Sequence, residues 1–195
     1  MSFVKHMIRR DRHFRGAISR RGFLARVGAV AAGSLLMPSQ EAFSKALTRE
    51  RRLTLINMNT DEELGIVCCP QQNYDRKTLA QFSHFLRDHR TDEAHPMDPA
   101  LIDLLYAMTV LTRGRGEYRI ISGYRAPETN NLLRKYSHGV AEHSLHMIGK
   151  AIDFRTDDLS TRALQTAAIA LQQGGVGYYP SADFVHVDTG DIRTW

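Results

Sequence analysis

The most constraining feature of the chain is a pair of short stretches, residues 144–154 and 184–190, that together carry two histidines and an aspartate. His146 and Asp153 lie in the first stretch, on either side of a glycine that permits a tight turn. His186 lies in the second stretch. Two imidazoles and one carboxylate suit a zinc ion that keeps one coordination position open. The fold must then bring a loop and two separate strands together at one point.

Strand alternation predicts that these side chains share one face of a sheet. In the segment 151–154, Asp153 points to the opposite face from its two apolar neighbours. A carboxylate between such neighbours is costly to bury alone, and a metal ion removes that cost. In the segment 184–188, His186 and Asp188 alternate with two valines that face the core. The sheet is therefore expected to have one apolar face and one face that carries the site.

The rest of the pattern predicts an α+β fold, with a small, mostly antiparallel sheet and helices packed on one side of it. Apolar residues at helical spacing indicate scaffold helices, and short β-branched segments with alternating polarity indicate strands. The expected strands are 53–57, 64–67, 117–122, 151–154, 176–179 and 184–188, and the expected helices are 74–89, 98–114, 127–137 and a last one that runs from the cap at 157–160 to the glycine pair at 174–175.

The positive charge of the chain is concentrated in residues 1–46. This segment holds nine Lys/Arg and two Asp/Glu, whereas the remaining residues hold 17 and 19. The formal net charge of +5 therefore does not belong to the part that is expected to fold as a domain. This distribution argues against nucleic acid as a partner.

The same N-terminal segment has the features of an export signal. Arg20 and Arg21 stand before an apolar pair, and residues 27–37 form an uncharged apolar stretch that is short for a bilayer span. Residues 1–46 thus resemble a twin-arginine signal peptide, and 47–195 is expected to be the exported domain. The resemblance implies a periplasmic protein with no membrane span after signal removal. A retained N-terminal helix that acts as a membrane anchor is the alternative.

The chain has only two cysteines, the adjacent Cys68 and Cys69. Neighbouring Cα atoms lie about 3.8 Å apart, which is shorter than the usual disulfide separation. A strained vicinal disulfide and two partly buried thiols are both compatible with this spacing. No nearby base is evident that would activate either thiol as a nucleophile.

Three motifs in order resemble the zinc peptidases that cut peptidoglycan peptides. They are Ser-Gly-Tyr-Arg at 122–125, Ser-x-His-x-x-Gly-x-Ala-x-Asp at 144–153, and Phe-Val-His-Val-Asp-Thr-Gly at 184–190. The resemblance covers roughly residues 50–195 and is closest to the murein endopeptidase K branch, which is related to the D-Ala-D-Ala peptidases. The Gly-Gly-Val-Gly-Tyr-Tyr-Pro run at 174–180 and the export signal also resemble that branch. The resemblance implies a Hedgehog/D-Ala-D-Ala-peptidase-like fold.

The resemblance also implies roles for individual residues. His146, Asp153 and His186 match the zinc ligands, with the fourth position left for water. Arg125 matches an arginine that stabilises the charged transition state in related dipeptidases.

The general base is left open between two carboxylates. Asp183 holds the place, three residues before the last ligand, where related D-Ala-D-Ala dipeptidases carry a longer glutamate. Asp188 shares a strand face with His186, and it is either the base or an orienting partner of that ligand.

The function expected from these features is that of a monomeric zinc-dependent peptidoglycan hydrolase. It would cleave amide bonds in cross-linked stem peptides as a murein DD/LD-endopeptidase, with peptidoglycan stem peptides as its partner molecules. One alternative is a D-alanyl carboxypeptidase. Another is a non-catalytic peptidoglycan-binding module whose zinc is closed off by a fourth ligand, for which His138 and His143 are the nearest histidines in sequence.

Overall fold

The structure is a computed structural model that describes residues 45–195 except 48, 69–73 and 138. The expected export signal, apart from its last two residues, lies outside the described residues, as do Cys69 and His138. Leu47 is already part of the buried core. Within the described residues, no helix has both the length and the apolar character that a membrane crossing requires.

The described strands form one mixed sheet in the order β2-β1-β3-β4-β6-β5-β7. Most neighbours are antiparallel, while β1 pairs with β3 and β5 pairs with β7 in parallel. The strands are β1 (Arg51–Asn57), β2 (Glu63–Cys68), β3 (Glu117–Ser122), β4 (Ala151–Arg155), β5 (Gly175–Tyr179), β6 (Phe184–Asp188) and β7 (Arg193–Thr194).

Two of the four described α-helices begin at a side-chain cap. The Asp75 carboxylate accepts a hydrogen bond from the backbone of Thr78 at 2.6 Å, and the Ser160 hydroxyl accepts one from Ala163 at 3.2 Å. The α-helices are α3 (Arg76–Phe85), α4 (Ala100–Thr112), α5 (Pro127–Tyr136) and α6 (Thr161–Leu171), with short 3-10 helices η2 (Leu145–Ile148) and η3 (Pro180–Ala182).

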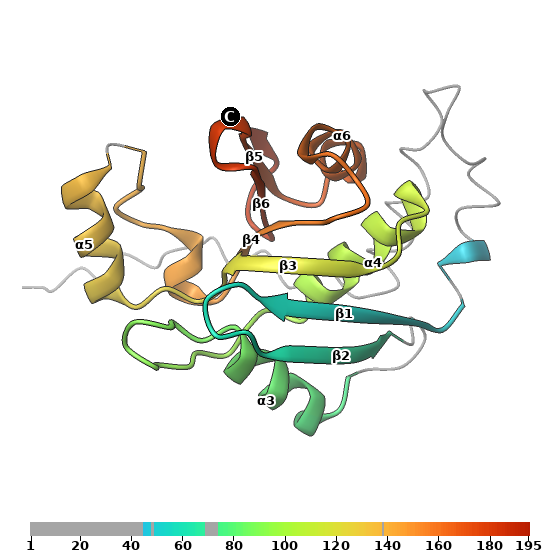
Figure 1. The fold of residues 1–195 in the computed structure, drawn as a ribbon, viewed down its shortest axis with the longest axis horizontal. Helices are drawn as coiled ribbons and strands as arrows, with labels where there is room; N and C mark the ends of the chain where they lie inside the picture. Colours follow the sequence, from blue (N-terminus) through green and yellow to red (C-terminus); the bar gives the residue numbers. More distant parts are fainter. Residues whose placement is uncertain (1–44, 48, 69–73, 138) are drawn as a thin grey trace, which may run out of the picture.

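The core lies between one face of the sheet and the buried helix α4. Tyr118 of β3 packs edge-on against Phe154 of β4, with ring centroids 5.1 Å apart. The Tyr118 hydroxyl donates to the backbone oxygen of Leu105 in α4 at 2.7 Å. α4 and α6 also contact each other. In Figure 1, α4 lies behind the central strands, α6 lies near β5 and β6, and α5 stands apart at the end where β3 terminates.

The sequence-based fold class is confirmed in its main terms, an α+β fold with a mostly antiparallel sheet. The parallel β1–β3 pair was not expected. It forms because α3 and α4 lie between these strands in sequence, which gives the chain the length for a crossover connection. The likeness to a Hedgehog/D-Ala-D-Ala-peptidase-like fold stays a prediction.

Candidate metal centre

His146 is placed by the short helix η2. Ser144 begins the helix, with its hydroxyl accepting a hydrogen bond from the His146 backbone at 3.4 Å. Gly149 ends it in the left-handed region, at a φ of 67°. A Cβ at this position would lie 2.2 Å from the Pro96 carbonyl oxygen, so both the backbone angle and the available space require glycine. The turn that was expected between the first two ligands is therefore present.

Asp153 and His186 are brought together by strand pairing. They are direct partners in the antiparallel β4–β6 register, and Ser122 of β3 pairs with Asp153 on its other side. Side chains opposite each other in such a pair lie on the same face of the sheet. Two ligands that are 33 residues apart in sequence thus become neighbours across one strand pair.

The three candidate ligands form a compact set of donor atoms. His146 Nε2 lies 3.1 Å from His186 Nδ1 and 3.3 Å from Asp153 Oδ1, and the last two atoms are 2.8 Å apart. Nitrogen and oxygen ligands at tetrahedral angles around zinc are about 3.3 Å apart. All three residues are buried. The donor set therefore fits a zinc ion in both chemistry and spacing.

Each imidazole is oriented by a hydrogen bond at its other nitrogen. His146 Nδ1 donates to the Gly123 carbonyl oxygen, 2.7 Å away, which leaves Nε2 with its lone pair toward the site. His186 presents Nδ1 to the site because Nε2 lies 3.1 Å from an oxygen of Asp188. Such partners fix both the tautomer and the ring plane of a metal-binding histidine.

Asp188 is fully buried, and its carboxylate is engaged by four groups. It accepts hydrogen bonds from the backbone of Gly175 at 2.9 Å and Gly190 at 2.8 Å, and Arg193 donates to it at 2.6 Å. Burial raises the pKa of Asp188, but His186, Arg193 and the two backbone N–H groups together lower it to about 2. This geometry is that of an orienting partner for His186.

The charges in the centre compensate one another. Burial by itself raises the pKa of Asp153, yet the two adjacent histidines hold it well below its usual value. Burial lowers the pKa of His186, but hydrogen bonds with Asp153 and Asp188 raise it to about 9. The carboxylate in the ligand set is therefore ionised near neutral pH, which is the form that binds a cation.

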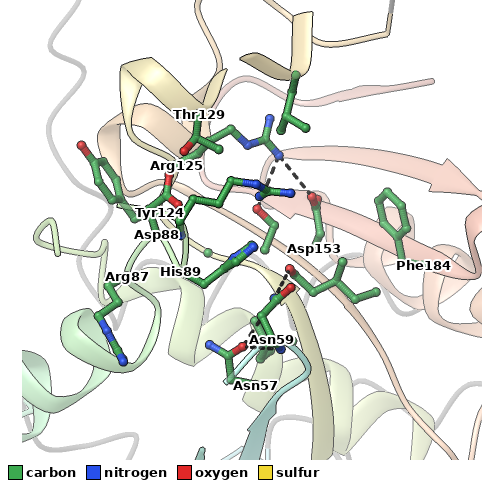
Figure 2. A pocket seen from close by; sticks show the side chains of 16 residues that line it. Asn57, Asn59, Arg87, Asp88, His89, Tyr124, Arg125, Thr129, Asp153 and Phe184 are labelled. Carbon is green, nitrogen blue, oxygen red and sulfur yellow. Dashed lines mark hydrogen bonds and ion pairs between the residues drawn. The ribbon is translucent and has the colours of Figure 1, made fainter. Parts of the chain in front are cut away.

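Arg125 lies beside the ligands, as expected. Its backbone N–H donates to the His146 carbonyl oxygen at 3.2 Å, and its guanidinium is 3.6 Å from Asp153 Oδ2. Its hydrogen bonds to the Ser122 hydroxyl and to Asn130 are long, at 3.4 and 3.5 Å. Figure 2 shows the contact with Asp153 as a dashed line. The guanidinium thus lies close to the candidate ligands, and none of its contacts with the described residues is a short hydrogen bond.

Asp183 lies on the surface and does not contact the ligand set. It follows η3 in the left-handed region, and its carboxylate accepts from Arg155 at 3.1 Å and from the Thr161 hydroxyl at 3.4 Å. The structure thus brings Asp188, but not Asp183, into contact with the candidate ligand set.

Two clefts flank the ligand set and share Arg125, Asp153 and Phe184. The first, with a volume of about 320 Å³, is bounded by the ends of β1 and β3 and by the loop after α3 (Figure 2). The second, of about 500 Å³, includes His146 and His186 in its wall.

Sequence reasoning missed Trp195, an aromatic residue beside the site. The Trp195 ring lies 5.2 Å from that of His186, and its indole N–H donates to the Tyr179 hydroxyl at 2.8 Å. His143 lines the second cleft but does not belong to the ligand set found among the described residues. The only sequence signal for Trp195 was its place as an aromatic residue beyond the last predicted strand, 184–188.

Two buried histidines and an aspartate beside open clefts on a mostly antiparallel sheet define a candidate metal-dependent hydrolase site. The family model described as peptidoglycan L,D-endopeptidase MepK, of the M15 type, matches residues 45–195. The chain belongs to this family of peptidases, which confirms the resemblance drawn from the motifs.

Two curated relatives illustrate the match. The peptidoglycan L,D-endopeptidase MepK of Escherichia coli K12 is 40% identical over 177 residues, which cover 91% of this chain and 97% of the relative. The probable peptidoglycan L,D-endopeptidase MepK of Haemophilus influenzae is 38% identical over 170 residues, covering 87% and 91%. No solved structure matches the chain.

Proposed function

We propose that this protein is a zinc-dependent peptidoglycan endopeptidase that cleaves amide bonds in cross-linked stem peptides. The observation that carries the proposal is the convergence of His146, Asp153 and His186 beside two open clefts. The relatives are named as peptidoglycan L,D-endopeptidases, and this activity suggests the substrate class and the preference for L,D bonds.

The three ligands would hold the metal, and the neighbouring Arg125 would stabilise the negative charge that develops on the substrate. A zinc ion in this set supplies Lewis acidity toward a peptide carbonyl and toward water. The Arg125 guanidinium lies 3.6 Å from the carboxylate of Asp153 and would donate to an oxyanion that develops beside the ligand set. Its burial makes such a hydrogen bond stronger than it would be in water.

The two candidate carboxylates would take different roles. Asp188 has no exposed surface and all its partners are protein groups, which supports orientation of His186 rather than proton transfer. Asp183 has an exposed carboxylate and is thus the candidate for proton transfer. To act at the ligand set it must leave Arg155, and this motion is part of the proposal.

The proposed setting is the periplasm, reached by the twin-arginine route, with the protein acting as a monomer. The proposed substrate contains D-centres and several free carboxylates, which suit a site flanked by arginines. The motifs point to cross-links that involve diaminopimelate.

The test is digestion of purified muropeptide dimers by the zinc-loaded protein, with the bound metal quantified in the same samples. The wild type is expected to convert dimers to monomers, and His146→Ala is expected to lose both bound zinc and activity. Asp183→Asn is expected to retain zinc and lose turnover, whereas Asp188→Asn is expected to bind zinc more weakly.

Other outcomes would reassign the function. Release of free D-alanine with dimers left intact would identify a D-alanyl carboxypeptidase. Bound zinc with every muropeptide intact would rule out the enzyme and leave a peptidoglycan-binding module.

A further inference from the structure

The first cleft contains an arginine that no part of the proposed chemistry uses. Arg90 lines this cleft in the loop after α3. Arg125 lies in the same wall, and after burial the positive charge of Arg90 also lowers the pKa of Arg125. Among the residues that the structure describes, nothing forms a hydrogen bond or ion pair with the Arg90 guanidinium. Arg87, also in this wall, differs because Glu62 at 2.8 Å and Asp92 at 2.6 Å bind its guanidinium.

The backbone that carries both arginines is fixed by one buried carboxylate. Asp88 accepts from the Arg90 N–H at 2.8 Å and from the Ala126 N–H, next to Arg125, also at 2.8 Å. Thr129 of α5 adds a further hydrogen bond to the same carboxylate. Figure 2 shows Asp88 between the loop that carries His89 and the segment that carries Arg125. Asp88 therefore ties together two walls of the cleft that are far apart in sequence.

The charge balance of the cleft favours an anion. Burial raises the pKa of Asp88, but its hydrogen bonds hold the pKa below the usual value, so its charge is already compensated by donors. The other acidic residue in the wall, Asp153, belongs to the metal ligands. Burial and Arg90 lower the pKa of His89, which makes it neutral near pH 7. Arg90 therefore remains as a cation without an anionic partner among the described residues, next to Arg125, whose nearest carboxylate is the candidate ligand Asp153 at 3.6 Å.

We propose that Arg90 binds a free carboxylate of the substrate in the first cleft, beside Arg125, and that Asp88 is the positioning residue that holds the Arg90 loop against the segment that carries Arg125. This proposal rests on the proposed function and names the substrate group that the first cleft recognises. Planar guanidinium groups bind carboxylates with paired, charge-assisted hydrogen bonds. In a diaminopimelate cross-link, the matching group is the free carboxylate of the diaminopimelate residue next to the scissile amide.

The direct test is calorimetric binding of a stem tetrapeptide to the zinc-loaded full-length protein. The peptide is used in two forms, with the diaminopimelate carboxylate free or amidated. The wild type is expected to bind the free form roughly 10- to 100-fold more tightly, which is the range for charge-assisted hydrogen bonds. Arg90→Gln is expected to bring this ratio close to one. Arg76→Gln, which removes an exposed arginine of α3 that lines neither cleft, is the matched control and is expected to keep the ratio.

The variant Asp88→Asn distinguishes a role of Asp88 in positioning Arg90 from a general loss of fold stability. A positioning role predicts weaker binding of the free peptide with little change for the amidated one, in a variant that still shows a cooperative melt. Equal losses for both peptides would show that Asp88 is only structural, and would overturn its part in the proposal.

The binding experiment also separates this subsite from the proposed function. It does not require turnover, so a protein that fails to cleave muropeptide dimers still gives a ratio of affinities. Equal wild-type affinity for the two peptides, or an unchanged ratio in Arg90→Gln, overturns the subsite even if dimers are cleaved.

Discussion

At the scale of single residues, the centre depends on groups that do not belong to the candidate ligand set. Asp188 orients His186, and the Gly123 carbonyl oxygen orients His146. The motifs identified Asp188 as a candidate residue but did not decide its role. Strand alternation gives only the face of the sheet on which a side chain lies. Its complete burial and its four partners are consequences of packing between β5, β6 and Arg193.

Asp188→Asn tests the orienting role. The amide keeps the volume but loses the charge that pairs with His186 and Arg193, so zinc affinity is expected to fall by roughly 10- to 100-fold. Competition with a chromophoric chelator measures this change. Asp191→Asn, an exposed neighbour, serves as the control and is expected to leave the affinity unaltered. Wild-type zinc affinity together with abolished turnover would instead make Asp188 the general base.

Asp88 is expected to make the protein sensitive to acid. Its pKa is lowered from 3.8 in the folded protein, so its contribution to stability is fully present above about pH 4 and is lost as the pH falls through the folded pKa. At pH 7, Asp88→Asn is expected to lower the free energy of unfolding by about 1–3 kcal/mol. Urea denaturation of both proteins between pH 7 and pH 3 measures the difference, which should shrink toward the acid end. A difference that is independent of pH would contradict this account.

At the scale of elements, the end of α3 decides the shape of the first cleft. The apolar spacing predicted a helix over 74–89, but the helix ends at Phe85. The reason is tertiary, since the Leu86 carbonyl oxygen accepts a hydrogen bond from the Tyr124 N–H at 2.7 Å instead of continuing the helix. The residues after it are thereby freed to form the loop that carries Asp88 and Arg90.

The short helix η2 depends on Gly149 in the same way. Gly149→Ala would place a methyl group 2.2 Å from the Pro96 carbonyl oxygen and would impose a left-handed backbone on alanine. The backbone cost alone is about 1–2 kcal/mol, and the clash adds to it, so both the melting temperature and the zinc affinity are expected to fall. Thermal denaturation and chelator competition measure the two effects. Gly139→Ala, where the nearest atom lies at 3.7 Å, should melt like the wild type, and similar melting of both variants would refute the argument.

At the scale of the whole molecule, the candidate metal ligands come from segments that the sheet order brings together. β4 lies between β3 and β6, so Asp153 is flanked by Ser122 on one side and by His186 on the other. η2 adds His146 from the loop that precedes β4. A bound ion would therefore connect elements from different parts of the chain, and its loss should affect the stability of the entire domain.

Removal of zinc is expected to lower the melting temperature. A ligand present at 1,000 times its Kd stabilises the folded state by about 4 kcal/mol, so calorimetric scans with zinc and with excess chelator should differ by several degrees. His146→Ala should melt at the same temperature under both conditions, because it lacks one ligand. If the wild-type protein melted at the same temperature with zinc and with excess chelator, that result would argue against a metal in this centre.

The sequence by itself predicted the three side chains that converge as a candidate ligand set, the alternation of polar and apolar strand faces, the four described helices and the family. These properties are carried by local spacing, which directly fixes where side chains project from a strand or a turn. Only the tertiary structure decided the parallel β1–β3 pair, the end of α3, the burial of Asp188 and the position of Asp183 away from the ligands. Each of these depends on which distant backbone or side-chain group meets a given donor or acceptor, and that information exists only once the chain has packed.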